Sequence, residues 1–319
     1  PPPSLPPSLV TCESITYTPQ TMNPQRCVHV SGCVKERDGM GLGGRVKKGV
    51  PAELVQDGCY LTIATTTCKR LNLFEQTMTS LVAAFENAEE MYRHVCKVIV
   101  VDDSSSEVDR ARMIKLFPDF HFVFKKEELR GHANSMNLIV DMVETRYLLY
   151  LEDDFLILGG GRRGGKILQD AMAVLTQQGS NQEIAQVLLN DQSSRMCAYA
   201  EPMNECDAGG IGSSGWRRKT PTGVEYIEHE FGVVYQAHAF SYWPGFSLNP
   251  GIWDLKRIKS KMGEGGFRFD PSDDRFEQTF SMKAHDAGLT FAHLPKLNVK
   301  HIGTVVSSYT LQGLERPWD

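Results

Sequence analysis

An apolar run from Tyr147 to Leu151 leads directly into three consecutive carboxylates, Glu152, Asp153 and Asp154. Adjacent acids repel one another and cannot be buried without partners, so this segment predicts a cation at the point where the acids lie. Open α/β sheets bind their ligands outside the carboxyl ends of their strands. On this segment alone, an acidic turn after a core strand is an equally good interpretation.

A second apolar run, residues 97–101, ends in Asp102 and Asp103. This is the pattern of a buried parallel strand that leads into a polar loop facing a ligand. Residues 60–65 predict an earlier strand. Asn72, with Glu75 three residues later, resembles a capping arrangement and predicts a helix that continues to about residue 94.

The elements that follow continue the alternation of strands and helices. Residues 120–124 predict a short strand, and apolar residues spaced as on one helical face predict a helix before the strand at 147. Further helices are expected over 166–178 and 274–287, with a strand at 186–189 and an extended segment at 293–301; residues 190–250 are left unassigned. The order predicts an α/β fold with a mainly parallel sheet flanked by helices.

The composition is that of a globular protein, because 41% of the 319 residues are hydrophobic and 23% are charged. A net charge of -5 and the lack of a long basic block argue against a nucleic-acid groove or an electrostatic membrane anchor. No apolar run approaches the length of a membrane span. We therefore expect a small-molecule substrate.

Residues 1–57, which are rich in Pro and Gly, predict a linker and an irregular cap. The chain starts at Pro1 rather than Met, so any membrane anchor is expected upstream of it. Four of the eight cysteines precede residue 60, and disulfides or reduced thiols both fit their spacing. We favour a Golgi or secretory lumen; the cytoplasm is the alternative, supported by the lack of any Asn-x-Ser/Thr acceptor.

From residue 58 to about residue 310, the order and spacing of these segments resemble the GT-A glycosyltransferases, in particular glycosyltransferase family 2. Residues 61–70 resemble the first strand and nucleotide loop of that family, with Thr66 in place of the usual Pro and Cys68 in place of an aromatic residue. The resemblance implies a GT-A (Rossmann-like) fold. It divides the domain 58–319 into a nucleotide-sugar-binding half, 58–160, and an irregular acceptor-binding half, 161–319.

The resemblance also implies which residues bind the donor. Asp102 corresponds to the acid that recognises the nucleotide base, and Asp103 follows it. Residues 130–137 correspond to the basic residue and the Asn-bearing helix near the donor. The implied donor contacts are Thr66, Arg70, Asp102, Asp103, Arg130, Asn137 and Asp153.

The family's Asp-x-Asp motif falls on residues 152–154. It implies that Asp154 binds a divalent metal directly, that Glu152 is a further candidate ligand, and that Asp153 meets the ribose or a metal-bound water. His301 matches a late histidine that completes the metal site in many GT-A enzymes. An imidazole among carboxylates suits Mn2+, and Mg2+ is the alternative.

The catalytic base of the family lies about eleven residues before a Gly that ends a late helix. Counting back from Gly288 gives Glu277, and Asp274 is its rival. The resemblance thus implies a metal-dependent, inverting glycosyltransferase. It would move a sugar from a nucleotide-diphosphate sugar, with a UDP-sugar as the expected donor, to a hydroxyl of a glycan or glycoconjugate.

Three other functions remain open at this stage. A sugar nucleotidyltransferase would use a similar sheet and metal but would release pyrophosphate. A P-loop phosphotransferase would use the segment from Gly160 to Lys166, where Ile167 replaces the Ser or Thr that binds magnesium. A non-catalytic carbohydrate-binding domain would use Trp243 and Trp253 as a platform.

Overall fold

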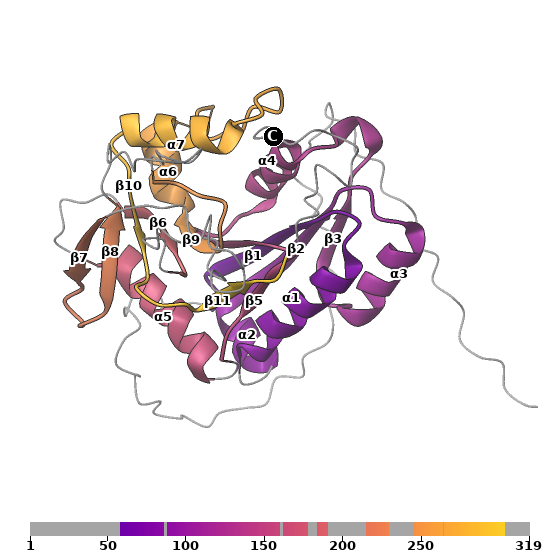
Figure 1. The fold of residues 1–319 in the computed structure, drawn as a ribbon, viewed down its shortest axis with the longest axis horizontal. Helices are drawn as coiled ribbons and strands as arrows, with labels where there is room; N and C mark the ends of the chain where they lie inside the picture. Colours follow the sequence, from indigo (N-terminus) through magenta and orange to yellow (C-terminus); the bar gives the residue numbers. More distant parts are fainter. Residues whose placement is uncertain are drawn as a thin grey trace, which may run out of the picture. The chain divides into compact units, whose positions relative to one another are not determined.

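A nine-stranded sheet forms the centre of the computed structural model, which describes residues 58–85, 88–159, 162–177, 184–190, 215–229, 245–263 and 265–303. The predicted cap at 1–57 lies outside these residues. The strands of this sheet, in sequence order, are β1 (Leu61–Thr67), β2 (Val95–Asp102), β3 (His121–Phe124), β4 (Tyr147–Glu152), β6 (Ile184–Leu188), β7 (Gly215–Lys219), β8 (Glu225–His229), β9 (Gly251–Asp254) and β10 (Thr290–His293). They lie side by side in the order β3-β2-β1-β4-β9-β6-β10-β8-β7 (Figure 1).

Most strands of the sheet run in one direction. β1 is parallel to β2 and β4, β2 is parallel to β3, and β6 is parallel to β10. β9 is antiparallel to both β4 and β6, and β8 is antiparallel to β10 and β7. Among the nine described strands of this sheet, β8 and β9 alone therefore run opposite to the rest. The predicted α/β fold with a mainly parallel sheet is confirmed.

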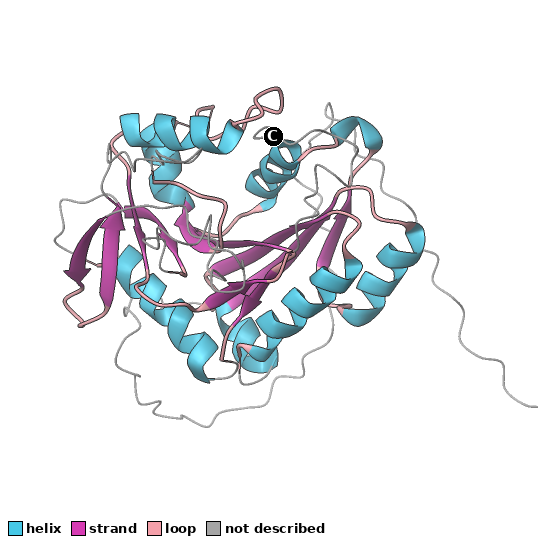
Figure 2. Cartoon of the chain, viewed as in Figure 1, coloured by secondary structure: helices cyan, strands magenta, loops and turns pink. Residues whose placement is uncertain are grey.

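Helices cover both faces of the sheet (Figure 2). They are α1 (Leu71–Ala83), α2 (Ala88–His94), α3 (Glu107–Leu116), α4 (His132–Met142), α5 (Arg162–Leu175), α6 (Leu255–Met262) and α7 (Phe276–Asp286), with a short 3₁₀ turn at Glu127–Leu129. One apolar core joins one face of the sheet to α1, α3 and α5, and a second core joins the other face to α4, α6 and α7. Burial on both faces explains the uninterrupted apolar runs Val98–Val101 in β2 and Tyr147–Leu151 in β4.

Strand register brings the polar residues to one edge of the sheet. Thr66 pairs with Val101 on one side and with Glu152 on the other, and Thr67 pairs with Asp102. The carboxyl ends of β1, β2 and β4 thus form one continuous edge.

A second, two-stranded sheet lies beside this edge. β5 (Phe155–Ile157) pairs antiparallel with β11 (Val299–His301), and His301 lies opposite Phe155. This pairing brings a residue from near the end of the chain next to the acids that follow β4.

Three local predictions differ from the structure. The helix expected over 72–94 is two helices, α1 and α2, and the residue that precedes α1 is Arg70, whose side chain does not cap it. Helix α3 was not predicted. The late helix begins at Phe276 rather than at residue 274.

Cys59 and Cys96 form a disulfide at the starts of β1 and β2. It joins these two neighbouring strands at the edge of the sheet opposite the carboxylates. None of the described helices combines the length and apolar character that crossing a membrane would need.

Candidate active site

Arg70 lies between the two acids that follow β4. One guanidinium nitrogen, Nη1, donates to Asp154 Oδ2 over 2.7 Å, and the other, Nη2, is paired with Asp153 Oδ1. Thr67 Oγ1 donates to Asp153 Oδ2 over 2.7 Å, and Thr77 Oγ1 donates to the Asp153 carbonyl over 2.8 Å. The guanidinium of Arg70 thus pairs with both of these acids within the protein.

The acids of this corner differ in their electrostatics. Burial raises the pKa of Asp153 to about 7, although the charge of Arg70 opposes the rise. Burial also disfavours the ionised form of Asp154, but the hydrogen bond from His301 and the charge of Arg70 outweigh it, so the pKa of Asp154 is lowered. Burial, followed by the charge of Asp154, raises the pKa of Glu152 well above its ordinary value. Asp154 is therefore the acid of the three that is best held as a carboxylate.

Asp154 and His301 have features that fit a divalent metal. His301 Nε2 lies 3.4 Å from Asp154 Oδ2, while Asp154 Oδ1 is buried and has no hydrogen-bond partner among the described residues. A Cβ added at Gly303 would lie 2.5 Å from Asp154 Oδ2 and 2.7 Å from His301 Nε2, so the glycine leaves this space open. Within the described ranges no three His, Cys, Asp or Glu side chains form a metal-binding group.

Asp102 is fully buried at the end of β2. Its Oδ2 accepts from Arg110 Nε over 2.8 Å and from the Ser105 amide over 3.2 Å, whereas its Oδ1 is buried without a hydrogen-bond partner in the described part of the chain. Asp102 thus has one anchored oxygen and one buried oxygen whose hydrogen-bonding capacity is unused among the described residues.

The neighbouring Asp103 is used within the protein. Its Oδ2 accepts from Lys125 Nζ over 3.0 Å and from the Gly131 amide over 2.8 Å. Lys125 Nζ also donates to the Gly131 carbonyl and to Ser135 Oγ, over 2.8 Å each. This buried group fixes the loop that precedes α4.

Two of the predicted donor contacts occupy different settings. Arg130 is about half exposed and donates to Ser104 Oγ over 3.1 Å, so its guanidinium lies beside the loop after β2. Asn137 lies in α4, where Nδ2 donates to the Phe269 carbonyl and Oδ1 accepts from the Phe269 amide. Asn137 thus fixes the chain around Phe269.

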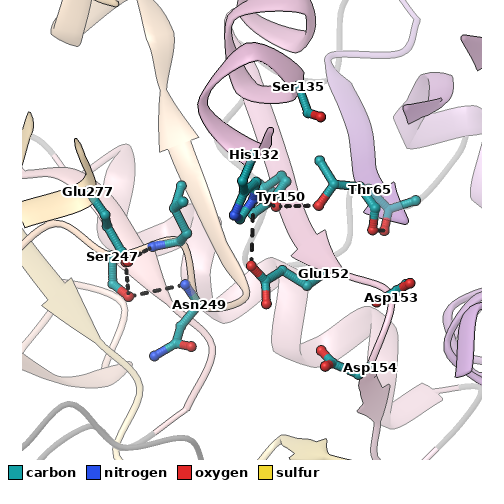
Figure 3. Close-up of polar contacts among 12 residues, drawn as sticks. Thr65, His132, Ser135, Tyr150, Glu152, Asp153, Asp154, Ser247, Asn249 and Glu277 are labelled. Atoms are coloured by element: carbon teal, nitrogen blue, oxygen red, sulfur yellow. Dashed lines mark hydrogen bonds and ion pairs between the residues drawn. The ribbon is translucent and has the colours of Figure 1, made fainter. Parts of the chain in front are cut away.

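A chain of hydrogen bonds links β1, β4 and α4. Tyr150 OH lies 2.8 Å from both Thr66 Oγ1 and His132 Nε2, and His132 Nε2 lies 3.6 Å from Glu152 Oε1. In Figure 3 the Glu152 side chain extends toward His132, whereas Asp154 lies apart from this pair, below it in the view. The structure thus places Glu152 with His132.

Glu277 lies in the first turn of α7. Its Oε1 accepts from the Leu248 amide over 2.6 Å and from Ser247 Oγ over 3.0 Å (Figure 3). Burial raises its pKa to about 7, despite these two hydrogen bonds. Its charge also contributes to the raised pKa values of Glu152 and Tyr150, which places Glu277 near the end of β4. Asp274, by contrast, is exposed in the turn before α7.

Two features that supported other functions have structural roles. Arg162 to Lys166 belong to helix α5, and Lys166 Nζ pairs with Asp170 over 2.8 Å on the surface, so no phosphate-binding loop precedes this helix at these residues. Trp253 is fully buried and packs edge-on against Phe246, so it offers no platform for a sugar. Trp243 lies outside the described residues.

Four polar residues of this edge were not predicted as site residues: Thr67, Lys125, His132 and Tyr150. Thr67 ends a predicted strand, so its place at the edge could have been inferred. Tyr150 was assigned to the apolar run, and the sequence carries no signal that its hydroxyl meets His132.

Residues 62–160 match the family model described as glycosyl transferase family 2. The predicted resemblance to that family is thereby confirmed over this segment. No curated protein sequence matches the chain.

Several solved glycosyltransferase structures are similar in fold. A crystal structure of GalNAc-T7 with UDP, GalNAc and Mn2+ has a TM-score of 0.50 and 13% identity, and covers 79% of this chain and 46% of that one. The mannosyltransferase PcManGT from Pyrobaculum calidifontis, with GDP-Man and Mn2+, has a TM-score of 0.47 and 11% identity, and covers 81% of this chain and 61% of that one. S. aureus TarS 1-349 with UDP-GlcNAc has a TM-score of 0.43 and 13% identity, over 78% and 62%. The chain therefore spans less than two thirds of each of these structures.

Proposed function

We propose that this protein is a metal-dependent, inverting glycosyltransferase that moves a sugar from a nucleotide-diphosphate sugar to a hydroxyl of a glycan or glycoconjugate. One observation carries the proposal. Asp102 ends β2 and Asp154 follows β4, the two strands that flank β1; His301 lies 3.4 Å from Asp154, and Glu277 interacts electrostatically with Glu152 at the end of β4. Ligands of open α/β sheets bind at the carboxyl ends of such strands.

The free oxygen of Asp102 supports recognition of the donor base. A carboxylate accepts hydrogen bonds only, and the imide N–H of uracil is a matching donor. A UDP-sugar is therefore the donor we propose. In the similar structures named above the ligands are UDP, UDP-GlcNAc or GDP-Man. The family 2 segment, residues 62–160, contains Asp102 itself.

Asp154 and His301 are the residues we propose for the metal, with Mn2+ preferred and Mg2+ as the alternative. A bound divalent ion would neutralise charge on the diphosphate that leaves. Arg70, which already lies against Asp154, supplies a second positive charge at the same place. Asp153 lies on the other side of Arg70 and is proposed as a contact of the donor or of a metal-bound water.

Glu277 is the proposed general base, because it is partly buried, oriented by two hydrogen bonds and raised in pKa to about 7. A base with a pKa near the working pH can take a proton from a hydroxyl as that hydroxyl attacks. The acceptor oxygen then forms a bond to the anomeric carbon while the bond from that carbon to the phosphate oxygen breaks. The nucleoside diphosphate leaves with the bonding electrons, and the anomeric centre is inverted. Asp274 is exposed and remains only the second candidate.

Location in a secretory or Golgi lumen is proposed on the Cys59–Cys96 disulfide, because disulfides persist in oxidising compartments. The glycan or glycoconjugate acceptor is proposed from the family 2 resemblance.

A donor screen tests the function. Purified protein is incubated with Mn2+ and a panel of UDP-, GDP- and TDP-sugars, and the released nucleotide is measured. We expect nucleoside diphosphate from a UDP-sugar, with release lost in Asp154→Asn. The control Asp141→Asn, which changes a surface ion pair with Arg268, should retain it. A sugar nucleotidyltransferase would release no nucleoside diphosphate here, and would instead form pyrophosphate in a parallel incubation with a nucleoside triphosphate and a sugar 1-phosphate.

Product stereochemistry tests the mechanism. Proton NMR of the transferred sugar should give an anomeric configuration opposite to that of the donor. Net retention would remove Glu277 from the role of in-line base.

A further inference from the structure

We propose that His132 is a positioning residue for the transfer reaction, which holds Glu152 between the donor-binding edge of the sheet and Glu277, so that the Glu152 carboxyl can bind a hydroxyl of the transferred sugar. This inference rests on the proposed glycosyltransferase function. It gives Glu152 a contact with the sugar in place of the metal.

The backbone position of His132 is fixed by the contacts of the preceding residue, Gly131. His132 is the first residue of α4, and Gly131 before it has φ of +104°, a conformation that favours glycine. The Gly131 amide donates to Asp103, and the Gly131 carbonyl accepts from Lys125 Nζ. The buried Lys125–Asp103 pair therefore holds Gly131 in place, and with it the backbone of His132.

The ring is also fixed at its far end. Nε2 lies 2.8 Å from Tyr150 OH and 3.6 Å from Glu152 Oε1, and Tyr150 OH lies 2.8 Å from Thr66 Oγ1. Burial lowers the pKa of His132 to about 4, assisted by the charges of Lys125 and Arg70, so the ring is neutral near pH 7. The neutral ring hydrogen-bonds to Tyr150 through Nε2 and meets Glu152 Oε1 in a contact that is longer than a hydrogen bond.

His132 also contacts the helix that carries the proposed base. Its ring meets Phe276 edge-on, with centroids 5.6 Å apart and planes at 78°. Phe276 directly precedes Glu277 in α7. One side chain thus contacts both the end of β4 and the start of α7, the two elements that carry Glu152 and Glu277.

Glu152 is suited to bind a substrate hydroxyl. Its side chain keeps about a third of its surface exposed, unlike Asp153 and Asp154, which are buried against Arg70. It lies near enough to Glu277 for the two charges to interact. In the proposed reaction the transferred sugar lies between the metal-bound diphosphate and the base Glu277. One of its hydroxyls would then lie next to the Glu152 carboxyl. Small misplacement of such a contact can lower a rate by about 100-fold.

Two substitutions separate positioning from folding. His132→Phe keeps an aromatic ring against Phe276 but removes Nε2, whereas His132→Gln places an amide nitrogen near the position of Nε2. His121→Gln, at an exposed histidine of β3, is the control. For each protein we would measure the thermal midpoint, UDP affinity, and kcat and KM for transfer and for donor hydrolysis.

We expect His132→Phe to keep the thermal midpoint and UDP affinity near wild type, to lower kcat for transfer by about 10- to 100-fold, and to raise the ratio of hydrolysis to transfer. His132→Gln should recover much of kcat. The proposal is overturned by an unchanged kcat in His132→Phe, or by a loss that follows the thermal midpoint or UDP affinity. If the wild-type protein transfers sugar and His132→Phe transfers it equally well, only the role of His132 fails. If the wild-type protein transfers none, the proposed function fails, and the role of His132 with it.

Discussion

Removing Arg70 should expose how strongly the acidic corner depends on its internal cation. In Arg70→Met, Asp153 and Asp154 would keep their buried positions but lose the guanidinium that contacts both of them. Their side chains are 0% and 5% exposed, and that of Arg70 is 14% exposed, so water cannot replace the lost contacts. Deleting one partner of a buried ion pair costs about 3–5 kcal/mol. We expect a loss of that size in the free energy of unfolding at pH 8.

The loss should depend on pH in a defined direction. Asp153 already has a pKa of about 7 in the folded protein, above its unfolded value of about 3.9, and loss of Arg70 would raise it further. A carboxyl with a raised folded pKa contributes stability that is present below the unfolded pKa and is lost as pH rises through the folded one. The deficit of Arg70→Met should therefore be largest at pH 8 and shrink toward pH 5, where protonation removes the unpaired charge.

Urea denaturation of the metal-free protein at several pH values would measure this deficit. Arg112→Met is the matched control, because Arg112 pairs with Glu75 over 2.9 Å with side chains 57% and 35% exposed. Exposed pairs contribute about 0–1 kcal/mol, so the control should change little at any pH. The reasoning is refuted if Arg70→Met is no less stable than the control at pH 8, or if its deficit grows on acidification.

The other predictions concern the base, the donor and the disulfide. Glu277→Gln should lower transfer by at least about 100-fold; because the base must be ionised and its pKa is about 7, wild-type kcat/KM should rise between pH 6 and 8, and a flat profile would contradict the role. Asp102→Asn should weaken UDP binding by about 10- to 100-fold in calorimetry, since it removes a charged acceptor; equal affinity would exclude the base contact. Cys59→Ser opens a loop with a sequence separation of 37 and should cost roughly 4 kcal/mol of unfolding free energy while kcat stays near wild type; a stability unaffected by the substitution would refute this.

The strands that deliver the acids could be predicted because their signals are local. An uninterrupted apolar run that ends in carboxylates is distinctive, and β2 and β4 both carry it. Helix α3 has no such signal, because Met113 is its only buried residue and its polar residues face all sides. The break between α1 and α2 was missed because neither Gly nor Pro marks it.

The contacts of the site depend on pairing between distant segments. Arg70 could have faced solvent, and only the register of β1 beside β4 brings it to Asp153 and Asp154. His301 reaches Asp154 through the pairing of β11 with β5, three residues on each side. His132 meets Tyr150 because α4 packs on the face of the sheet to which the Tyr150 side chain belongs. None of these three contacts can be predicted from the local periodicity or composition of the sequence.

The reversed strand β9 has a consequence for how this protein can be divided. It pairs with β4 through Leu149 and Ile252 and with β6 through Val187 and Ile252. The free side of β4, an early strand, is therefore hydrogen-bonded to a strand from late in the chain. The segment matched by the family model ends at residue 160 and lacks β9. Expressed alone, that segment would present β4 as a bare, wholly apolar edge from Tyr147 to Tyr150, which invites aggregation. A chimera that exchanges donor halves between relatives would have to carry residues 251–254 along with the half that it transplants.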